Sequence, residues 1–145
     1  DLRGPQIEWD AYVADVRPAY RRAEVVVAPL LASAGTNIKI LEAMAMGKAI
    51  VATPAALHGL EIQSGREAVV TASIQDMADA VLALLRDPDG RRAMGRAARR
   101  RAEDVYDWNR IAERQAELYR SLIRPGARAG AALSGVSPCP SHSPQ

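Results

Sequence analysis

Short apolar runs and longer stretches with helical spacing alternate along this chain. Apolar runs at residues 24–28, 49–52 and 68–71 are bounded by Pro, Gly or Ser residues, a pattern typical of buried strands. Another short strand is expected at residues 6–9. Each run therefore predicts one strand of a small sheet.

Helices are expected where apolar residues recur every three or four positions. A capping side chain at the start, or a Gly or Pro at the end, marks their limits. Two helices are predicted in the first half of the chain, at residues 16–22 after the cap Asp15 and at residues 37–46 before Gly47. Two more are predicted at residues 74–85, after a capping box of Ser73 and Asp76, and at residues 91–102, after a break at 87–90. The last helix starts at the cap Asp107 and ends at Pro125, and its stripe consists of Ile111, Gln115, Leu118 and Leu122.

The order of these elements predicts an α/β fold with a Rossmann-like parallel sheet and C-terminal helices, because parallel strands need helical crossovers. The 145 residues fit one domain, which we place at residues 1–123. Residues 124–145 are rich in Gly, Ala, Ser and Pro. Such a segment buries too little apolar surface to order itself, so we expect a disordered tail there.

Composition narrows the kind of partner. Hydrophobic residues make up 48% of the chain, but aromatic residues only 4%, and Phe is absent. The core must therefore be aliphatic, and a base-stacking surface for single-stranded nucleic acid is not indicated. Cys139 is the single cysteine, and His58 and His142 lie far apart, so the sequence offers no metal-ligand spacing. We expect no metal and no cofactor.

Arginines are concentrated in one region. Seven of them fall between Arg86 and Arg101, together with only two aspartates, although the whole chain carries a net charge of +2. A solvated helix face and a patch that meets an anionic membrane surface or another domain both fit this pattern. No apolar run is long enough to span a bilayer.

The loop at residues 31–36 is the first candidate for chemistry. It is built of small residues, contains Gly35, and leads from a strand end into a helix. Ligands of parallel α/β sheets bind at such loops, and free N–H groups at a helix start favour phosphate. An ordinary strand-to-helix connection fits equally well.

Glu42 is the second candidate. Ile38, Leu41, Met44 and Ala45 are expected to share one helix face, and Glu42 lies at its border. A carboxylate there needs a partner. Lys39, three residues earlier, is one choice, and the two hydroxyls of a vicinal diol such as ribose are another.

These residues resemble a known family. The stretch from Ala34 to Thr53, which contains Ile-Leu-Glu-Ala-Met-Ala-Met-Gly, is similar to the signature of retaining GT-B-fold glycosyltransferases of the group 1 (family 4) type. Residues 13–29 and 58–70 resemble the segments on either side, and Tyr106-Asp-Trp108 resembles the closing helices. The resemblance covers residues 11–123.

The resemblance implies a donor site in a C-terminal, nucleotide-sugar-binding domain. Glu42 would be the second glutamate of the family's E-x7-E motif and accept hydrogen bonds from the nucleotide ribose. The other implied donor contacts are Gly35, Thr36 and Asn37 against the donor sugar and diphosphate, Lys39 as a replacement polar contact, and Ile40 and Leu41 near the nucleoside.

Two departures change the expectation. Ala34 stands where the motif has its first glutamate, and no counterpart is found for the Arg and Lys that grip the diphosphate. The N-terminal domain of the family, which holds the acceptor site, is also missing. We therefore expect a fragment that is inactive alone, with its catalytic residues elsewhere.

The function implied by the resemblance is transfer of a sugar, with retention, from a UDP-, GDP- or ADP-sugar to a hydroxyl of a glycan or lipid-linked acceptor. Bacterial polysaccharide biosynthesis would place the protein in the cytoplasm, in peripheral contact with the inner membrane face through residues 86–101. A non-catalytic nucleotide-binding or scaffold module and a non-hydrolysing nucleotide-sugar epimerase remain as alternatives. A dinucleotide-dependent oxidoreductase fits least, because G-x-G-x-x-G is absent.

Overall fold

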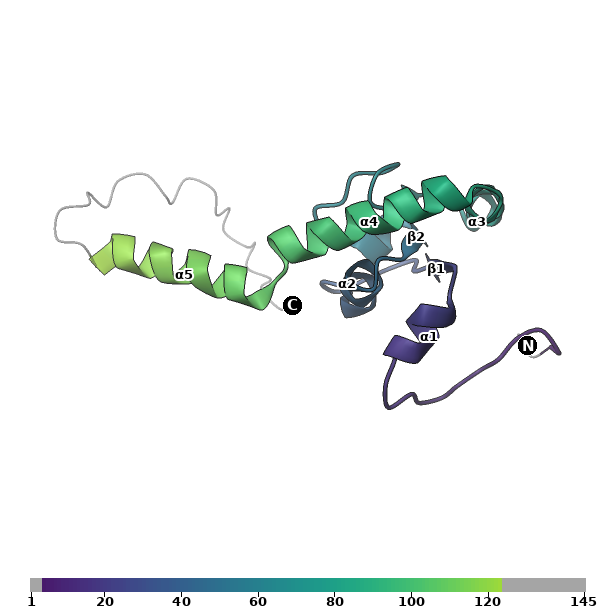
Figure 1. Ribbon diagram of the computed structural model, residues 1–145, viewed down its shortest axis with the longest axis horizontal. Coiled ribbons are helices and arrows are strands. Elements are labelled where there is room, and N and C mark those ends of the chain that lie inside the picture. The colour runs from purple at the N-terminus through teal and green to yellow at the C-terminus, as the bar shows by residue number, and fades with distance from the viewer. Residues whose placement is uncertain (1–3, 124–145) are drawn as a thin grey trace, which may run out of the picture.

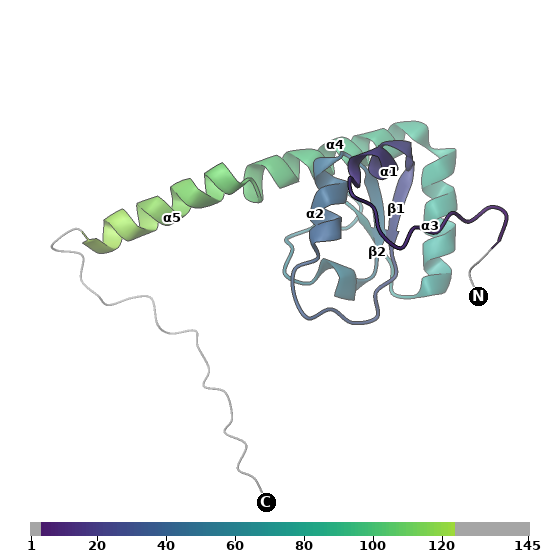
Figure 2. The ribbon, with the colours of Figure 1, turned by 90° about the horizontal axis from the view of Figure 1, so that it is seen from below.

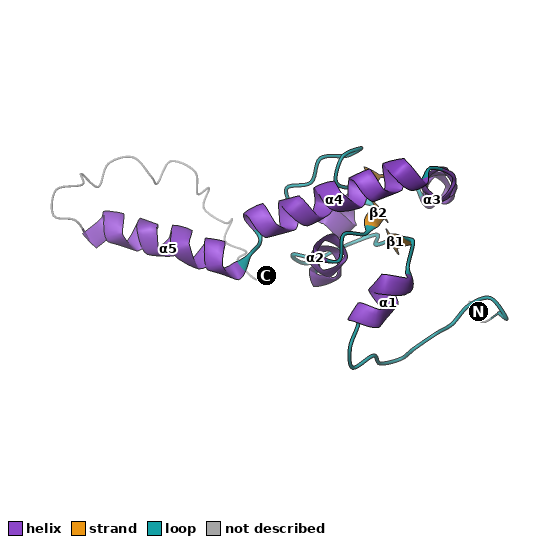
Figure 3. Cartoon of the chain, in the orientation of Figure 1, coloured by secondary structure: helices purple, strands orange, loops and turns teal. Residues whose placement is uncertain are grey.

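A three-stranded parallel sheet forms the centre of the protein. The computed structural model describes residues 4–123, and the tail expected at residues 124–145 lies outside them. The strands β1 (Val25–Ala28), β2 (Ala49–Ala52) and β3 (Val69–Val70) stand in the order β1-β2-β3. Val25 pairs with Ala49, and Val51 pairs with Val69. The predicted α/β class and all three main strands are confirmed (Figures 1 and 3).

The remaining elements are helices, and their order also follows the prediction. They are α1 (Arg17–Arg22), α2 (Ile38–Ala45), the 3-10 turn η1 (Pro54–Leu57), α3 (Ile74–Arg86), α4 (Pro88–Val105) and α5 (Trp108–Ile123).

The core has two sides that share the central strand. Every residue of β2 is buried, and successive side chains point to opposite faces. Ile50 packs with Ile40 and Met44 of α2. Val51 on the opposite face packs with Met77 and other residues of α3. The helix α4 reaches both sides, with Ala98 on the α2 side and Met94 on the α3 side.

Two predictions about element limits are wrong. No strand forms at residues 6–9, where the chain is exposed and follows a turn closed by the hydrogen bond from the Ile7 N–H to the Gly4 oxygen at 2.9 Å. The break at residues 87–90 is confined to Asp87, because Pro88 begins α4. Proline suits the first helical position, where its missing N–H has no partner to lose. Asp87 stabilises this start by accepting the N–H of Gly90 at 2.9 Å.

The buried face of α2 also differs from the prediction. Ile40, Ala43 and Met44 are buried, whereas Ile38 is 69% exposed and Ala45 is exposed. The helix packs against both β2 and α4, so its contact stripe is turned toward Ala43. Ile38 therefore lies outside this stripe, and the border position Glu42 is half-buried.

The last helix extends away from the α/β body. Figures 1 and 2 show α5 as an arm that continues beyond the end of α4. Asp107 caps it as predicted, by accepting the N–H of Asn109 at 2.9 Å. None of its residues is buried, and the apolar stripe at Leu118 and Leu122 is exposed.

Candidate functional site

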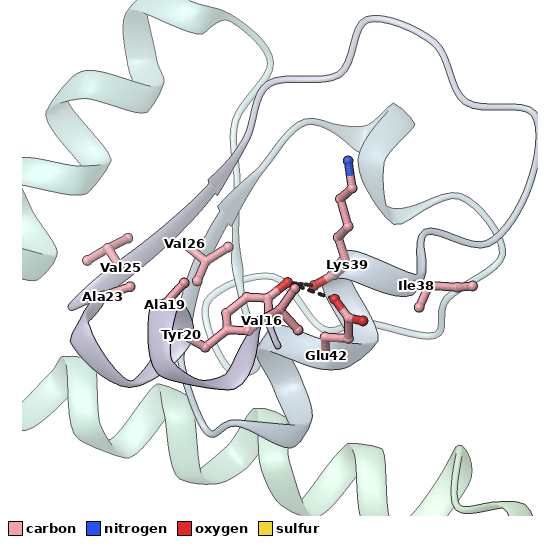
Figure 4. Close-up of a pocket in the computed structure, with 9 residues that line it drawn as sticks. All are labelled: Val16, Ala19, Tyr20, Ala23, Val25, Val26, Ile38, Lys39 and Glu42. Carbon is pink, nitrogen blue, oxygen red and sulfur yellow. Dashed lines mark hydrogen bonds between the residues drawn. The ribbon is translucent and has the colours of Figure 1, made fainter. Parts of the chain in front are cut away.

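Glu42 and Tyr20 form the polar centre of the candidate site. The Tyr20 hydroxyl of α1 lies 3.1 Å from Oε2 of Glu42 and 3.0 Å from the main-chain oxygen of Lys39 (Figure 4). A phenol has one hydrogen, so the two oxygens share one donor. An ionised carboxylate is the stronger acceptor. The hydroxyl therefore holds the Glu42 carboxylate against the first turns of α2.

A groove of about 640 Å³ surrounds this pair. It lies between α1, β1 and α2, and Figure 4 shows its mainly apolar lining. Two further grooves, of about 590 and 510 Å³, adjoin α2 on the sides of α4 and of the segment before α1. Glu42 lines all three. Its carboxylate thus stands where three depressions meet.

The environment of Tyr20 keeps its phenol protonated. Burial raises the pKa of Tyr20 to about 12, and the hydrogen bond to Glu42 and the negative charge of that carboxylate act in the same direction. Near neutral pH the Tyr20 hydroxyl therefore keeps its hydrogen and can donate it to Glu42.

The loop before α2 is held by its own polar side chains. Nδ2 of Asn37 donates to the main-chain oxygen of Ala56 at 3.2 Å and to Oγ of Ser33 at 3.3 Å. Ser33 in turn donates to the oxygen of Gly35 at 2.9 Å. Asn37 is the N-cap residue of α2, yet its side chain accepts no hydrogen bond there. Ile40 already donates its N–H to the Asn37 main-chain oxygen at 3.0 Å, so the N–H groups of Ile38 and Lys39 are the ones in the first turn that remain available to an anion.

A second segment supports this loop from the side. Gly59 has a φ of +77°, and a Cβ there would lie 2.9 Å from Oγ1 of Thr36. The position of the Thr36 side chain therefore requires a glycine at residue 59, which contacts it in space. The adjacent His58 is exposed, as expected of a surface-loop histidine.

The structure brings only some of the predicted donor contacts together. Lys39 and Leu41 line grooves that also contain Glu42. Gly35, Thr36 and Asn37 line none of these three grooves, and they lie in the loop that precedes α2. Ile40 is 1% exposed and belongs to the core. Its side chain thus supports the helix instead of lining a groove.

Sequence reasoning did not single out Tyr20 for the site. It lies 22 positions before Glu42, so no periodicity relates the two residues. Only the packing of α1 beside α2 makes them neighbours.

Several arginine side chains of α4 form salt bridges within the protein. Arg91 contacts Glu24 at 2.6 Å, and Arg101 contacts Glu61 at 2.9 Å. Arg99 pairs with Glu103 at 2.7 Å along α4. The first two contacts join α4 to the residue before β1 and to the segment before β3, and the third lies within α4. These arginines therefore have a local structural role.

Neither a metal site nor a membrane span is found in residues 4–123. No group of three or more His, Cys, Asp or Glu residues there is arranged to hold a metal ion. None of the helices in this range is long and apolar enough to cross a membrane.

The fold and the placement of Glu42 define a parallel α/β domain with a groove-lining carboxylate on the helix that follows β1. Sequence comparison identifies its family. The profile described as "Glycosyl transferases group 1" matches residues 2–87, more than half of the chain. The protein therefore belongs to the group 1 glycosyltransferases.

Solved structures agree with this assignment. Sucrose-phosphate synthase from Thermosynechococcus elongatus matches with a TM-score of 0.64 and 25% identity, covering 74% of this chain and 27% of that one. The C-terminal domain of a glycosyl transferase group 1 family protein, LpcC, from Francisella tularensis matches with a TM-score of 0.63 and 24% identity, covering 70% of this chain and 53% of that one. The fold is that of a GT-B C-terminal domain. A comparison with curated proteins gives no match.

Proposed function

We propose that this chain supplies part of the nucleotide-sugar donor site of a retaining glycosyltransferase. In this proposal Glu42 accepts hydrogen bonds from the ribose of a UDP-, GDP- or ADP-sugar. The observation that carries it is the position of the Glu42 carboxylate, which lines three grooves while one phenol is its hydrogen-bond partner among residues 4–123. An ionised carboxylate with free acceptor positions suits a vicinal diol.

The start of α2 supports a place for the diphosphate. The Asn37 side chain does not cap the first turn, so the free N–H groups of Ile38 and Lys39 and the positive end of the helix dipole favour an anion there. Lys39 adds a positive charge within the same turn, and Figure 4 shows its side chain extending away from the Tyr20–Glu42 pair. Gly35 and Thr36 would then lie against the donor sugar. Negative charge that grows on the leaving diphosphate would be stabilised by these groups.

Sugar transfer itself needs more than this chain provides. The chain spans about a quarter of the sucrose-phosphate synthase structure and about half of the LpcC structure. The acceptor, a glycan or a lipid-linked hydroxyl, would bind to a part of the enzyme outside this chain. We therefore expect donor binding, but not transfer, from the chain alone.

A non-catalytic nucleotide-binding module is the second candidate. Ala34 favours it, because an alanine replaces a carboxylate that the family motif places near the donor sugar. The two candidates differ in whether a longer protein that contains this chain transfers sugar. Both require nucleotide binding through Glu42.

Calorimetric titration with UDP, GDP and ADP tests the shared requirement. The Glu42→Ala variant loses a charge-assisted hydrogen bond worth about 1.5–3 kcal/mol, so its affinity should fall roughly 10- to 150-fold. Glu113→Ala, which removes an exposed carboxylate from α5, is the matched control and should bind like wild type. Equal binding by wild type and Glu42→Ala would refute the ribose role.

A further inference from the structure

The Tyr20 hydroxyl contacts the Glu42 carboxylate from a different helix. Tyr20 is on α1 and Glu42 on α2, and the two oxygens are 3.1 Å apart. The other acceptor within reach, the Lys39 oxygen, lies in the first turn of α2, where the helical pattern already gives it an N–H donor. Glu42 is therefore the acceptor that gains most from the phenol hydrogen.

The contact gives a hydrogen bond to one oxygen of the Glu42 carboxylate but not to the other. Oε2 receives the Tyr20 hydroxyl, and Oε1 receives no hydrogen bond from any residue in the range 4–123. A free glutamate side chain at a helix surface samples several rotamers, and fixing it on binding costs free energy. A hydrogen bond to one oxygen removes part of that cost before any ligand arrives. It also leaves the other oxygen of Glu42 free to accept from a ligand in the grooves that this residue lines.

We propose that Tyr20 is a positioning residue for the ribose of the donor. Its hydroxyl anchors Oε2 of Glu42, so that Oε1 and the remaining lone pair of Oε2 are presented together to the ribose diol. This inference rests on the proposed ribose role of Glu42 and adds the residue that makes this role specific. Tyr20 itself need not touch the nucleotide.

The proposal predicts how the site distinguishes ribose from deoxyribose. A diol satisfies both prepared acceptor positions, whereas a 2′-deoxyribose leaves one of them unpaired, which is costly in a partly buried site. Without Tyr20 the carboxylate reorients, so the second hydroxyl contributes less. Tyr20→Phe should therefore weaken ribonucleotide binding more than deoxyribonucleotide binding.

The experiment compares wild type, Tyr20→Phe, Glu42→Ala and the double variant. Each is titrated with UDP, GDP and ADP and with the 2′-deoxy forms. Loss of one net hydrogen bond corresponds to a decrease of roughly 3- to 10-fold in the affinity of Tyr20→Phe for the ribonucleotide. Its affinity for the deoxy form should hardly change. In the double variant, loss of Tyr20 should have no further effect, because Glu42 is already absent.

A control separates positioning from general loss of structure. Tyr119→Phe removes a phenol oxygen on α5 that lies 3.4 Å from a side-chain nitrogen of Gln115, and it should bind every nucleotide like wild type. If Tyr20→Phe weakens the ribo and deoxy forms equally, its role is structural and the proposal is wrong. If Glu42→Ala weakens binding but Tyr20→Phe does not, the ribose role stands and this proposal fails. If neither variant weakens binding, or wild type binds no nucleotide, both proposals fail.

A second measurement applies if Tyr20→Phe does not fold. In the wild-type chain with ring-labelled tyrosine, the NMR signal of the Tyr20 ring carbon that bears the hydroxyl reports on its hydrogen bond. It should shift when the nucleoside diphosphate binds and shift less with the 2′-deoxy form. Equal shifts, or none, would overturn the positioning role.

Discussion

Gly95 of α4 lies directly against the main-chain carbonyl of Gly47, the residue that ends α2. Gly47 has a φ of +63°, the left-handed conformation common after a helix. A Cβ added to Gly95 would overlap the Gly47 oxygen and lie 2.9 Å from its carbonyl carbon. The two helices thus approach so closely because Gly95 has no side chain, whereas a Cβ on Gly47 would lie 3.7 Å from the Gly95 oxygen, an ordinary contact. Their contact sets the position of α2, and with it the position of Glu42.

Gly95→Ala should therefore destabilise the protein. Alanine favours a helix over glycine by about 1 kcal/mol, but overlap with main-chain atoms that cannot turn aside costs about 1–3 kcal/mol or more. The expected result is a lower midpoint of urea unfolding. Gly4→Ala is the control, because a Cβ there meets nothing within 4 Å. A Gly95→Ala variant more stable than wild type would show that α2 and α4 separate easily.

High pH should weaken the fold through Tyr20. Its pKa is raised to about 12 in the folded protein, against about 10 in an unfolded chain. The folded state therefore holds the phenol proton more tightly, and this contribution is complete below about pH 10 and lost as the pH rises toward about 12. Urea midpoints measured across this range should fall less steeply for Tyr20→Phe than for wild type. Parallel curves would show that burial and the contact with Glu42 do not raise the pKa of Tyr20 in the folded protein.

Equal loss of apolar volume should have unequal effects in α2 and α5. Met44 is fully buried, and Met44→Ala should cost about 2–5 kcal/mol of unfolding free energy. Leu122 is 70% exposed, and Leu122→Ala should change stability by no more than about 0.5 kcal/mol. Chemical denaturation of both variants checks the pair. A large loss for Leu122→Ala would mean that α5 packs against something in solution.

The cap of α5 should stabilise that helix alone. Asp107 accepts the N–H groups of Asn109 and Arg110 at 2.9 and 3.3 Å, and loss of such a cap costs about 1 kcal/mol. Because no residue of α5 is buried, we expect Asp107→Ala to speed amide exchange in α5 roughly fivefold and to leave the sheet unchanged. Asn109→Ala keeps the capped N–H and serves as the control. Faster exchange throughout the sheet would show that α5 is coupled to the body.

Local signals in the sequence were sufficient for most of the fold. The apolar run at residues 49–52 is the central strand, Gly47 ends α2, and Ser73 caps α3 by accepting the N–H of Asp76 at 3.2 Å. Each of these features depends on residues within a few positions. The strand expected at residues 6–9 failed because its apolar residues have no partner strand in the described part of the chain, where the sheet has three strands.

The candidate site was only partly predictable for the same reason. Glu42 follows from helix geometry and from the family motif, and the structure places it among grooves. Which face of α2 is buried depends on α4, which is more than 40 positions away, so Ile38 and Ile40 could not be assigned from periodicity. The contact with Tyr20 depends on the path of the chain between α1 and α2. Tertiary packing decides both.

The arm formed by α5 also determines how the molecule moves through water. Its 16 residues add a rod of about 24 Å to one end of the body, at about 1.5 Å per residue. A compact domain of this size would have a radius of gyration of about 14 Å. Mass held so far from the centre increases friction, so the protein should diffuse and tumble like a larger particle.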